Sequence, residues 1–337
     1  MTFSRLGLAA STAALLLTPT LALSAPQVVV SIKPIHSLVA AIMQGVGEPS
    51  LIVEGAASAH TYSLKPSHAR ALQNADLVFW VGSGLEAFLE KPLDALAGKA
   101  KVVELEDAPG LVRLRFREGG AFESHEDEGD NADGADHAAH DDHDPHEDHA
   151  AVEHAAEEPG HEHEHGGFDM HLWLNPMNAK AMAAEIESAL VATDPANAAR
   201  YRANGQVLAQ DIDTLDKDIA IAVAPVADRP FVVFHDAYQY FENRYKVRVA
   251  GSITVSPETM PGAERISEIH GKVKELQAAC VFAEPQFEPK LVSVVTEGTD
   301  AKAGVLDPEG GALEAGPALY TQLMRNLAKS LTDCLSQ

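Results

Sequence analysis

The chain has 337 residues, 46% of them hydrophobic, which is enough for two domains of ordinary size. The formal net charge of −25 is uneven: residues 118–166 contain 18 Asp or Glu and no Lys or Arg, so the remainder of the chain carries −7. Because no basic surface is available to neutralise phosphates, nucleic acid and anionic lipid are excluded as expected partners.

Residues 1–24 are typical of a secretory signal peptide. Arg5 supplies the positive charge, and residues 6–17 form an apolar run that is too short to span a bilayer comfortably. Small residues at Ala22 and Ser24 suit cleavage before Ala25. We therefore expect a protein that is exported and is soluble after the signal peptide is removed.

Apolar runs rich in β-branched residues alternate with helical patterns in the first part of the mature chain. Strands are predicted at 28–32, 50–54, 76–81 and 101–105, and helices at 34–44 and 66–75. Continuous apolar strands separated by helices predict a parallel sheet with both faces covered. We assign residues 25–118 and 167–193 to an N-terminal α/β lobe, which residues 119–166 interrupt.

The inserted residues 119–166 consist mainly of His, Asp, Glu, Ala and Gly, without apolar periodicity, which predicts disorder. The segment is either a solubilising acidic stretch or a source of auxiliary metal ligands. Its density of histidines, several of them spaced three residues apart, favours metal binding. The candidate auxiliary ligands are His137, His140, His143, His146, His149, His161, His163 and His165.

Residues 194–225 are predicted to form one long helix. Asp194 and Pro195 suit its start, apolar residues follow at near-helical spacing, and Pro225 ends it. A helix of ~29 residues would be about 44 Å long, which suits a rigid rod joining two lobes.

Residues 226–337 repeat the α/β alternation and are assigned to a C-terminal lobe. Strands are predicted at 231–235, 247–255, 280–284 and 303–306, and helices at 237–245, 261–278, 289–299 and 317–335. The predicted fold is therefore α/β, with two parallel-sheet lobes joined by one long rigid helix. Since ligands bind at the carboxyl ends of strands in open α/β sheets, a cleft between the lobes is the expected metal site.

The two cysteines, Cys280 and Cys334, are predicted to form a disulfide. The alternative, a metal–thiolate pair, is less favoured because exported proteins meet an oxidising environment. In the chain-entropy model, closing a loop of ~55 residues contributes roughly 4 kcal/mol to stability.

Three histidines outside the insertion lie where strands or loops are expected to end at the cleft. His60 follows the strand at 50–54, His171 lies between apolar residues just after the insertion, and His235 ends an apolar strand. Each alone is more typical of a structural histidine than of a ligand. Three at comparable positions in an exported chain favour a shared metal site.

The sequence around these histidines resembles a known family. HTYSLKPS (60–67), DMHLWLNP (169–176) and FHDAYQYF (234–241) are similar to the three metal-binding segments of the solute-binding proteins that serve metal-ion ABC importers, and GSITVSPETMPGAERI (251–266) and GVLDP (304–308) also match. The resemblance is strongest to the ZnuA-type zinc-binding proteins, because of the acidic His-rich insertion and because manganese- and iron-binding relatives usually have Glu at the position of His235.

This resemblance implies that His60, His171 and His235 bind Zn²⁺ and that Asp307 completes the site. It also implies a monomeric periplasmic protein that is not an enzyme and that passes the ion to a membrane permease of the ABC type. Some relatives have Glu before the first ligand, where this chain has Ala59. The fourth ligand is therefore open between Asp307, water and an insertion histidine. The insertion would act as a zinc reservoir or sensor. An exported zinc hydrolase and a metal-storage protein remain the alternatives.

Overall fold

The described part of the chain contains two four-stranded parallel sheets, which confirms the predicted α/β class. The computed structural model describes residues 25–117, 122, 167–254, 261–287 and 290–336. The predicted signal peptide and all eight auxiliary histidines of the insertion lie outside the described residues.

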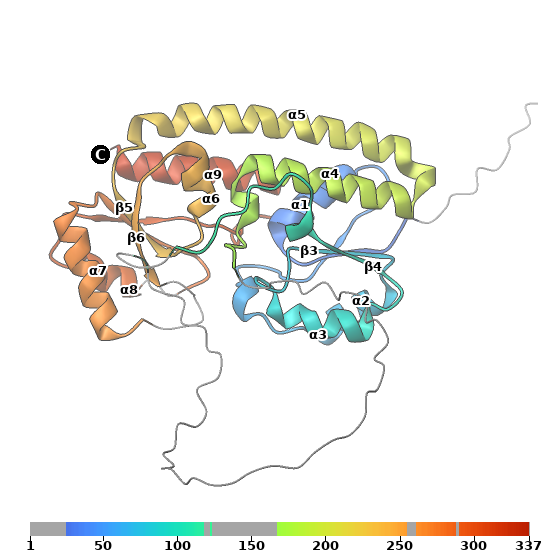
Figure 1. Cartoon of the computed structure of the whole chain (residues 1–337), viewed down its shortest axis with the longest axis horizontal. Coiled ribbons are helices and arrows are strands. Elements are labelled where there is room, and N and C mark those ends of the chain that lie inside the picture. Colours follow the sequence, from blue (N-terminus) through green and yellow to red (C-terminus); the bar gives the residue numbers. More distant parts are fainter. Residues whose placement is uncertain (1–24, 118–121, 123–166, 255–260, 288–289, 337) are drawn as a thin grey trace, which may run out of the picture.

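The first sheet has the order β2–β1–β3–β4 and is covered by helices on both faces (Figure 1). Its strands are β1 (Val28–Val30), β2 (Ser50–Leu51), β3 (Leu77–Trp80) and β4 (Lys101–Glu104). The helices are α1 (Lys33–Ile42), α2 (Pro66–Asn74), α3 (Ala87–Leu96) and α4 (Pro176–Thr193). Every residue of β1 and β3 is buried, which explains their uninterrupted apolar sequences.

The second sheet repeats this topology with the order β6–β5–β7–β8. Its strands are β5 (Phe231–His235), β6 (Val249–Thr254), β7 (Cys280–Ala283) and β8 (Lys302–Val305). The helices are α6 (Gln239–Tyr245), α7 (Ala263–Glu275), α8 (Lys290–Thr296) and α9 (Leu319–Leu335). All eight strands predicted from the sequence are present among the described residues.

A 26-residue helix, α5 (Ala198–Val223), extends over both sheets (Figure 1). It packs against α4, α1 and α9, and its buried face includes Leu208, Ile212 and Leu215. The α-helix begins at Ala198, later than predicted, because Pro195–Asn197 forms a 3-10 turn. The domain boundaries drawn around this helix, and its rigidity, stay predictions.

The predicted disulfide between Cys280 and Cys334 is present, with the two Cα atoms 6.3 Å apart. It attaches α9 to the start of β7, and so connects the end of the chain to the second sheet. Among the described residues, none of the helices combines the length and apolar character needed to cross a bilayer.

Candidate metal centre

His60 lies in a short 3-10 turn, η1 (Ala59–Thr61), in the connection that follows β2. The turn is capped by Ser58, whose hydroxyl oxygen accepts a hydrogen bond from the His60 backbone N–H at 3.3 Å. This local bond orients the backbone from which the imidazole projects. His60 is only partly buried, so it is the most accessible of the three predicted ligands.

His171 directly precedes the 3-10 turn η3 (Leu172–Leu174). Oδ1 of Asp169 lies 3.0 Å from the His171 backbone nitrogen and 2.8 Å from its Nδ1. Asp169 is fully buried, and His171 is 6% exposed. One carboxylate therefore fixes both the backbone and the ring of His171.

His235 is the last residue of β5, and its Nδ1 lies 2.8 Å from Oε1 of Glu284. Because β5 and β7 are neighbouring parallel strands, their carboxyl ends bring His235 and Glu284 to the same edge of the sheet. Burial raises the pKa of Glu284 to about 8, opposed by the His235 backbone N–H and the charge of His171.

The three imidazoles converge where the two sheets meet. Nε2 of His171 lies 3.4 Å from Nε2 of His60 and 3.3 Å from Nε2 of His235. Among the described residues, His60, His171 and His235 are the one group of three or more His, Cys, Asp or Glu side chains whose potential ligand atoms all lie within 4.8 Å of one another. The geometry thus brings together the three histidines that the sequence singled out.

This spacing matches a tetrahedral zinc ion. Nitrogen ligands lie about 2.05 Å from zinc, so two of them in tetrahedral array are about 3.3 Å apart. Where Asp169 and Glu284 accept the Nδ1 protons of His171 and His235, each ring keeps the lone pair on Nε2 for a metal. When ionised, the two buried carboxyl groups would also supply negative charge near a divalent cation.

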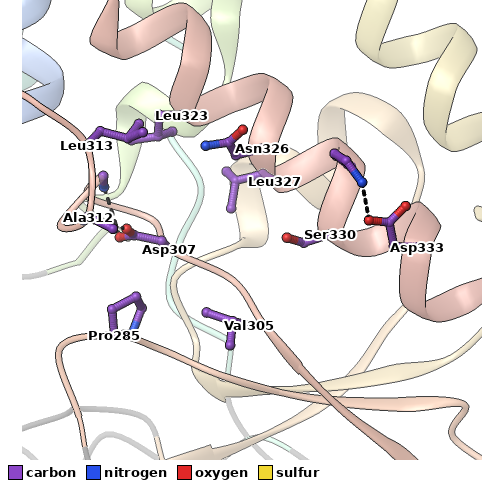
Figure 2. Close-up of a pocket in the computed structure, with 12 residues that line it drawn as sticks. Pro285, Val305, Asp307, Ala312, Leu313, Leu323, Asn326, Leu327, Ser330 and Asp333 are labelled. Carbon is purple, nitrogen blue, oxygen red and sulfur yellow. Dashed lines mark hydrogen bonds and ion pairs between the residues drawn. The ribbon is translucent and has the colours of Figure 1, made fainter.

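The structure does not bring Asp307 into this group. Its Oδ1 accepts hydrogen bonds from Gln286 Nε2 at 2.9 Å and from the Gly310 backbone at 2.9 Å, and its Oδ2 accepts one from Ala312 at 3.3 Å. Figure 2 shows Asp307 beside Ala312 at a pocket of about 350 Å³ bordered by α9. A role for Asp307 as fourth ligand stays a prediction.

Sequence reasoning missed the carboxylates Asp169 and Glu284, and also Glu309. Glu309 is 7% exposed, and its Oε1 accepts a hydrogen bond from the Ala59 backbone at 3.4 Å. Burial raises the pKa of Glu309 to about 7, while the nearby His60 acts in the opposite direction. Glu284 carried one usable signal, since a carboxylate at the end of an apolar strand faces the same edge as His235.

Comparison with known proteins places the chain in a family. The family model for the zinc-uptake complex component A, periplasmic (ZnuA), matches residues 28–334. The high-affinity zinc uptake system protein ZnuA of Brucella suis is 59% identical over 310 residues, covering 92% of each chain. The protein of the same name from Yersinia pestis is 35% identical over 322 residues, covering 96% of this chain and 95% of its own.

Solved structures show that the fold is shared as well. A ZnuA crystal structure superposes with a TM-score of 0.71 at 22% identity, covering 92% of this chain and 99% of its own. The periplasmic zinc-binding protein TroA from Treponema pallidum gives 0.73 at 20% identity, covering 93% of this chain and all of its own. With its sequence matched over nearly all of the described residues, the chain belongs to the ZnuA family of periplasmic zinc-uptake components.

Proposed function

We propose that this protein captures zinc in the periplasm and delivers it to the membrane permease of an ABC importer. The observation that carries the proposal is the spacing of the three Nε2 atoms, 3.3 and 3.4 Å from the central His171, which equals the ligand spacing around tetrahedral zinc. The ZnuA relatives at 59% and 35% identity support the same role.

Each histidine has a defined part in this function. His171 and His235 are buried and held by carboxylates, so they form the fixed part of the site. His60 is more exposed than the other two, so it is the ligand that can leave first when zinc is released. Because the ligands come from both predicted lobes, bound zinc would connect the lobes. Helix α5 would limit the relative movement of the lobes to a small rocking motion.

The ligand set also favours zinc over manganese, because imidazole suits zinc whereas manganese prefers oxygen ligands. Copper binds imidazole tightly too, so selection against copper depends on geometry and availability. Water is the fourth ligand that best fits the described residues, since the Asp307 oxygens already accept hydrogen bonds from Gln286 and the loop backbone.

The insertion would serve as a zinc reservoir or sensor for this site. The described residues that flank it lie near His171 in the chain or contact a neighbour of His235. Arg115 pairs with Phe168, three residues before His171, in an antiparallel bridge, and Arg117 Nε donates to Oδ2 of Asp236, next to His235, at 3.1 Å. Ions bound weakly by the insertion would therefore be released near the tight site. The mature protein would act as a monomer.

Zinc stoichiometry and affinity test the proposal. His60→Ala, His171→Ala and His235→Ala are each made in a protein with residues 123–166 replaced by a short Gly-Ser linker, and zinc is titrated in competition with a chelator. We expect one tight site in the linker protein and none in the histidine variants, with unchanged circular dichroism. His36→Ala is the matched control, because His36 bonds to the Pro49 carbonyl away from the group.

A tight site that persists in all three histidine variants would refute the proposal. Two further assays address the alternatives. Hydrolysis of simple esters or phosphates by the zinc-loaded protein, abolished by His171→Ala, would favour a zinc hydrolase. Normal growth under zinc limitation after deletion of the chain would favour storage over import.

A further inference from the structure

The loop of residues 307–313, here called the inter-lobe loop, connects β8 to the segment that leads into α9. Asp307 organises it by accepting hydrogen bonds from the backbone N–H groups of Glu309, Gly310 and Ala312, at 3.3, 2.9 and 3.3 Å. Figure 2 shows Asp307 and Ala312 facing each other in this turn. The carboxylate therefore determines the shape of the loop.

The inter-lobe loop contacts the segments that contain His60 and His171. The Pro308 carbonyl accepts a hydrogen bond from Trp173 Nε1 at 2.8 Å, two residues from His171. Glu309 accepts one from the backbone of Ala59, the neighbour of His60. A movement of the loop would therefore reach the His60 and His171 segments together.

Gly311 makes a third contact, in which the loop lies close to the backbone of Ala56. A Cβ atom added to Gly311 would lie 3.0 Å from Cα of Ala56, in the connection that leads to η1. A backbone atom at that distance cannot yield as a flexible side chain can. Glycine at 311 thus permits the loop to lie directly against the His60 segment.

Lys33, the first residue of α1, connects the inter-lobe loop to the predicted N-terminal lobe. Its Nζ donates to three carbonyl oxygens of the loop: Gly310 at 3.2 Å, Gly311 at 2.9 Å and Leu313 at 2.8 Å. The residue is only 7% exposed, and an ammonium group has three protons to donate. Every proton has an acceptor in one loop, so the amine fits this loop conformation specifically.

We propose that Lys33 is a positioning residue for zinc binding: it holds the inter-lobe loop in the conformation that places the His60 and His171 segments at ligand distance. The inference rests on the proposed function, because it concerns the affinity of that same site. Lys33 changes zinc affinity only to the extent that its three hydrogen bonds are stronger in the loaded protein than in the empty one.

The test compares Lys33→Met and Lys33→Arg in the full mature chain. The tight-site Kd is measured by chelator competition below one equivalent of zinc, and the release rate by stopped flow with excess chelator. We expect Lys33→Met to raise the Kd about tenfold and to speed release by a similar factor, as is typical when groups behind the ligands are lost. Lys33→Arg, which keeps charge and donors, should recover most of this loss.

Lys272→Met is the matched control, because Lys272 is on the surface of α7 and pairs there with the exposed Glu275 at 3.2 Å. Gly311→Ala is the second variant: it displaces the loop from Ala56 without removing a charge, and we expect a smaller rise in Kd. It decides the matter if Lys33→Met does not fold. A Kd and release rate within twofold of wild type in the folded variants would overturn the inference.

A purely structural role is recognised by a different result. Lys33→Met would then lower the Tm of the empty and loaded proteins equally and leave the Kd unchanged. His171→Ala separates this inference from the proposed function. If His171→Ala still binds zinc tightly, the proposed function fails; if it does not and Lys33→Met binds like wild type, only the role of Lys33 fails.

Discussion

Nε2 of His171 lies 3.3 Å from Nε2 of His235, although 64 positions separate the two residues in the sequence. Each ring is also held at its other nitrogen by a buried carboxylate, Asp169 or Glu284, at 2.8 Å. The orientation of each ring is therefore determined by a buried carboxyl group at Nδ1, with Nε2 directed toward the other ring. This arrangement is the basis of the predictions below.

Replacing either carboxyl group by an amide should weaken zinc binding while the three imidazoles remain. For Asp169→Asn and Glu284→Gln we expect the Kd to rise by about 10- to 100-fold, the usual effect of groups that orient ligating histidines. Competition with a chelator measures this. Asp213→Asn, which removes a partner of Lys180 on the surface, should leave the Kd unchanged. Equal affinity in all variants would show that the carboxylates do not support the site.

Asp307→Ala tests whether Asp307 is a zinc ligand or only organises the inter-lobe loop. Because the Asp307 oxygens accept hydrogen bonds from Gln286 and the inter-lobe loop, we expect the zinc coordination number from X-ray absorption to stay the same. The Kd should rise through movement of the loop. Loss of one oxygen ligand in the absorption spectrum would instead identify Asp307 as the fourth ligand.

Glu86 predicts a pH dependence of stability that is independent of zinc. Its side chain is fully buried, accepts hydrogen bonds from the backbones of Val81 and Gly82, and has a pKa raised by burial from 4.5 to about 7. Between these values the folded protein keeps a proton that the unfolded chain has released. The free energy of unfolding therefore falls as the pH rises from about 4.5 to 7, by up to about 3 kcal/mol.

Glu86→Gln keeps the acceptor for both backbone N–H groups and cannot ionise. Urea unfolding of the metal-free proteins should show that the advantage of Glu86→Gln over wild type grows from pH 5 to 7 and then levels off. Other buried carboxyls, such as Glu309, titrate in both proteins and cancel in the difference. A difference that does not change with pH would contradict the prediction.

The disulfide should stabilise the second half without contributing to the metal site. Cys280 lies at the start of β7, whereas Glu284 follows its other end. In Cys280→Ala/Cys334→Ala we expect a loss of roughly 4 kcal/mol of unfolding free energy, as the chain-entropy model gives for a loop of this size. Urea unfolding measures the loss. The zinc Kd should change less than twofold, and a larger change would mean that α9 influences the site.

Much of the fold was predictable because its signals are local. The inner strands β1, β3, β5 and β7 are buried apolar runs bounded by helical patterns, and the disulfide follows from two cysteines in a chain that is expected to be exported. Helix α3 (Ala87–Leu96) was missed because Pro92 interrupts its pattern, yet the structure accommodates Pro92 inside the helix. The start of α5 was placed early because Asp194 and Pro195 are typical of helix starts, but here they begin a 3-10 turn.

The sequence singled out the three histidines that the structure brings together, but not the groups that hold them in place. His60, His171 and His235 stand in recognisable segments, and strand topology brings their ends together. The contact between Lys33 and the inter-lobe loop joins residues about 280 positions apart, and no local pattern indicates it. Asp307 was named as a possible ligand because of the family resemblance, and that role stays a prediction; no local pattern indicates the turn that its carboxylate organises.

Anomalous diffraction at the zinc edge tests the central claim most directly. Crystals are grown of the protein in which residues 123–166 are replaced by a Gly-Ser linker, loaded with one equivalent of zinc. We predict one strong peak about 2.0–2.1 Å from the Nε2 atoms of His60, His171 and His235. A peak elsewhere, or a zinc ion bound by fewer than three of these rings, would contradict the account.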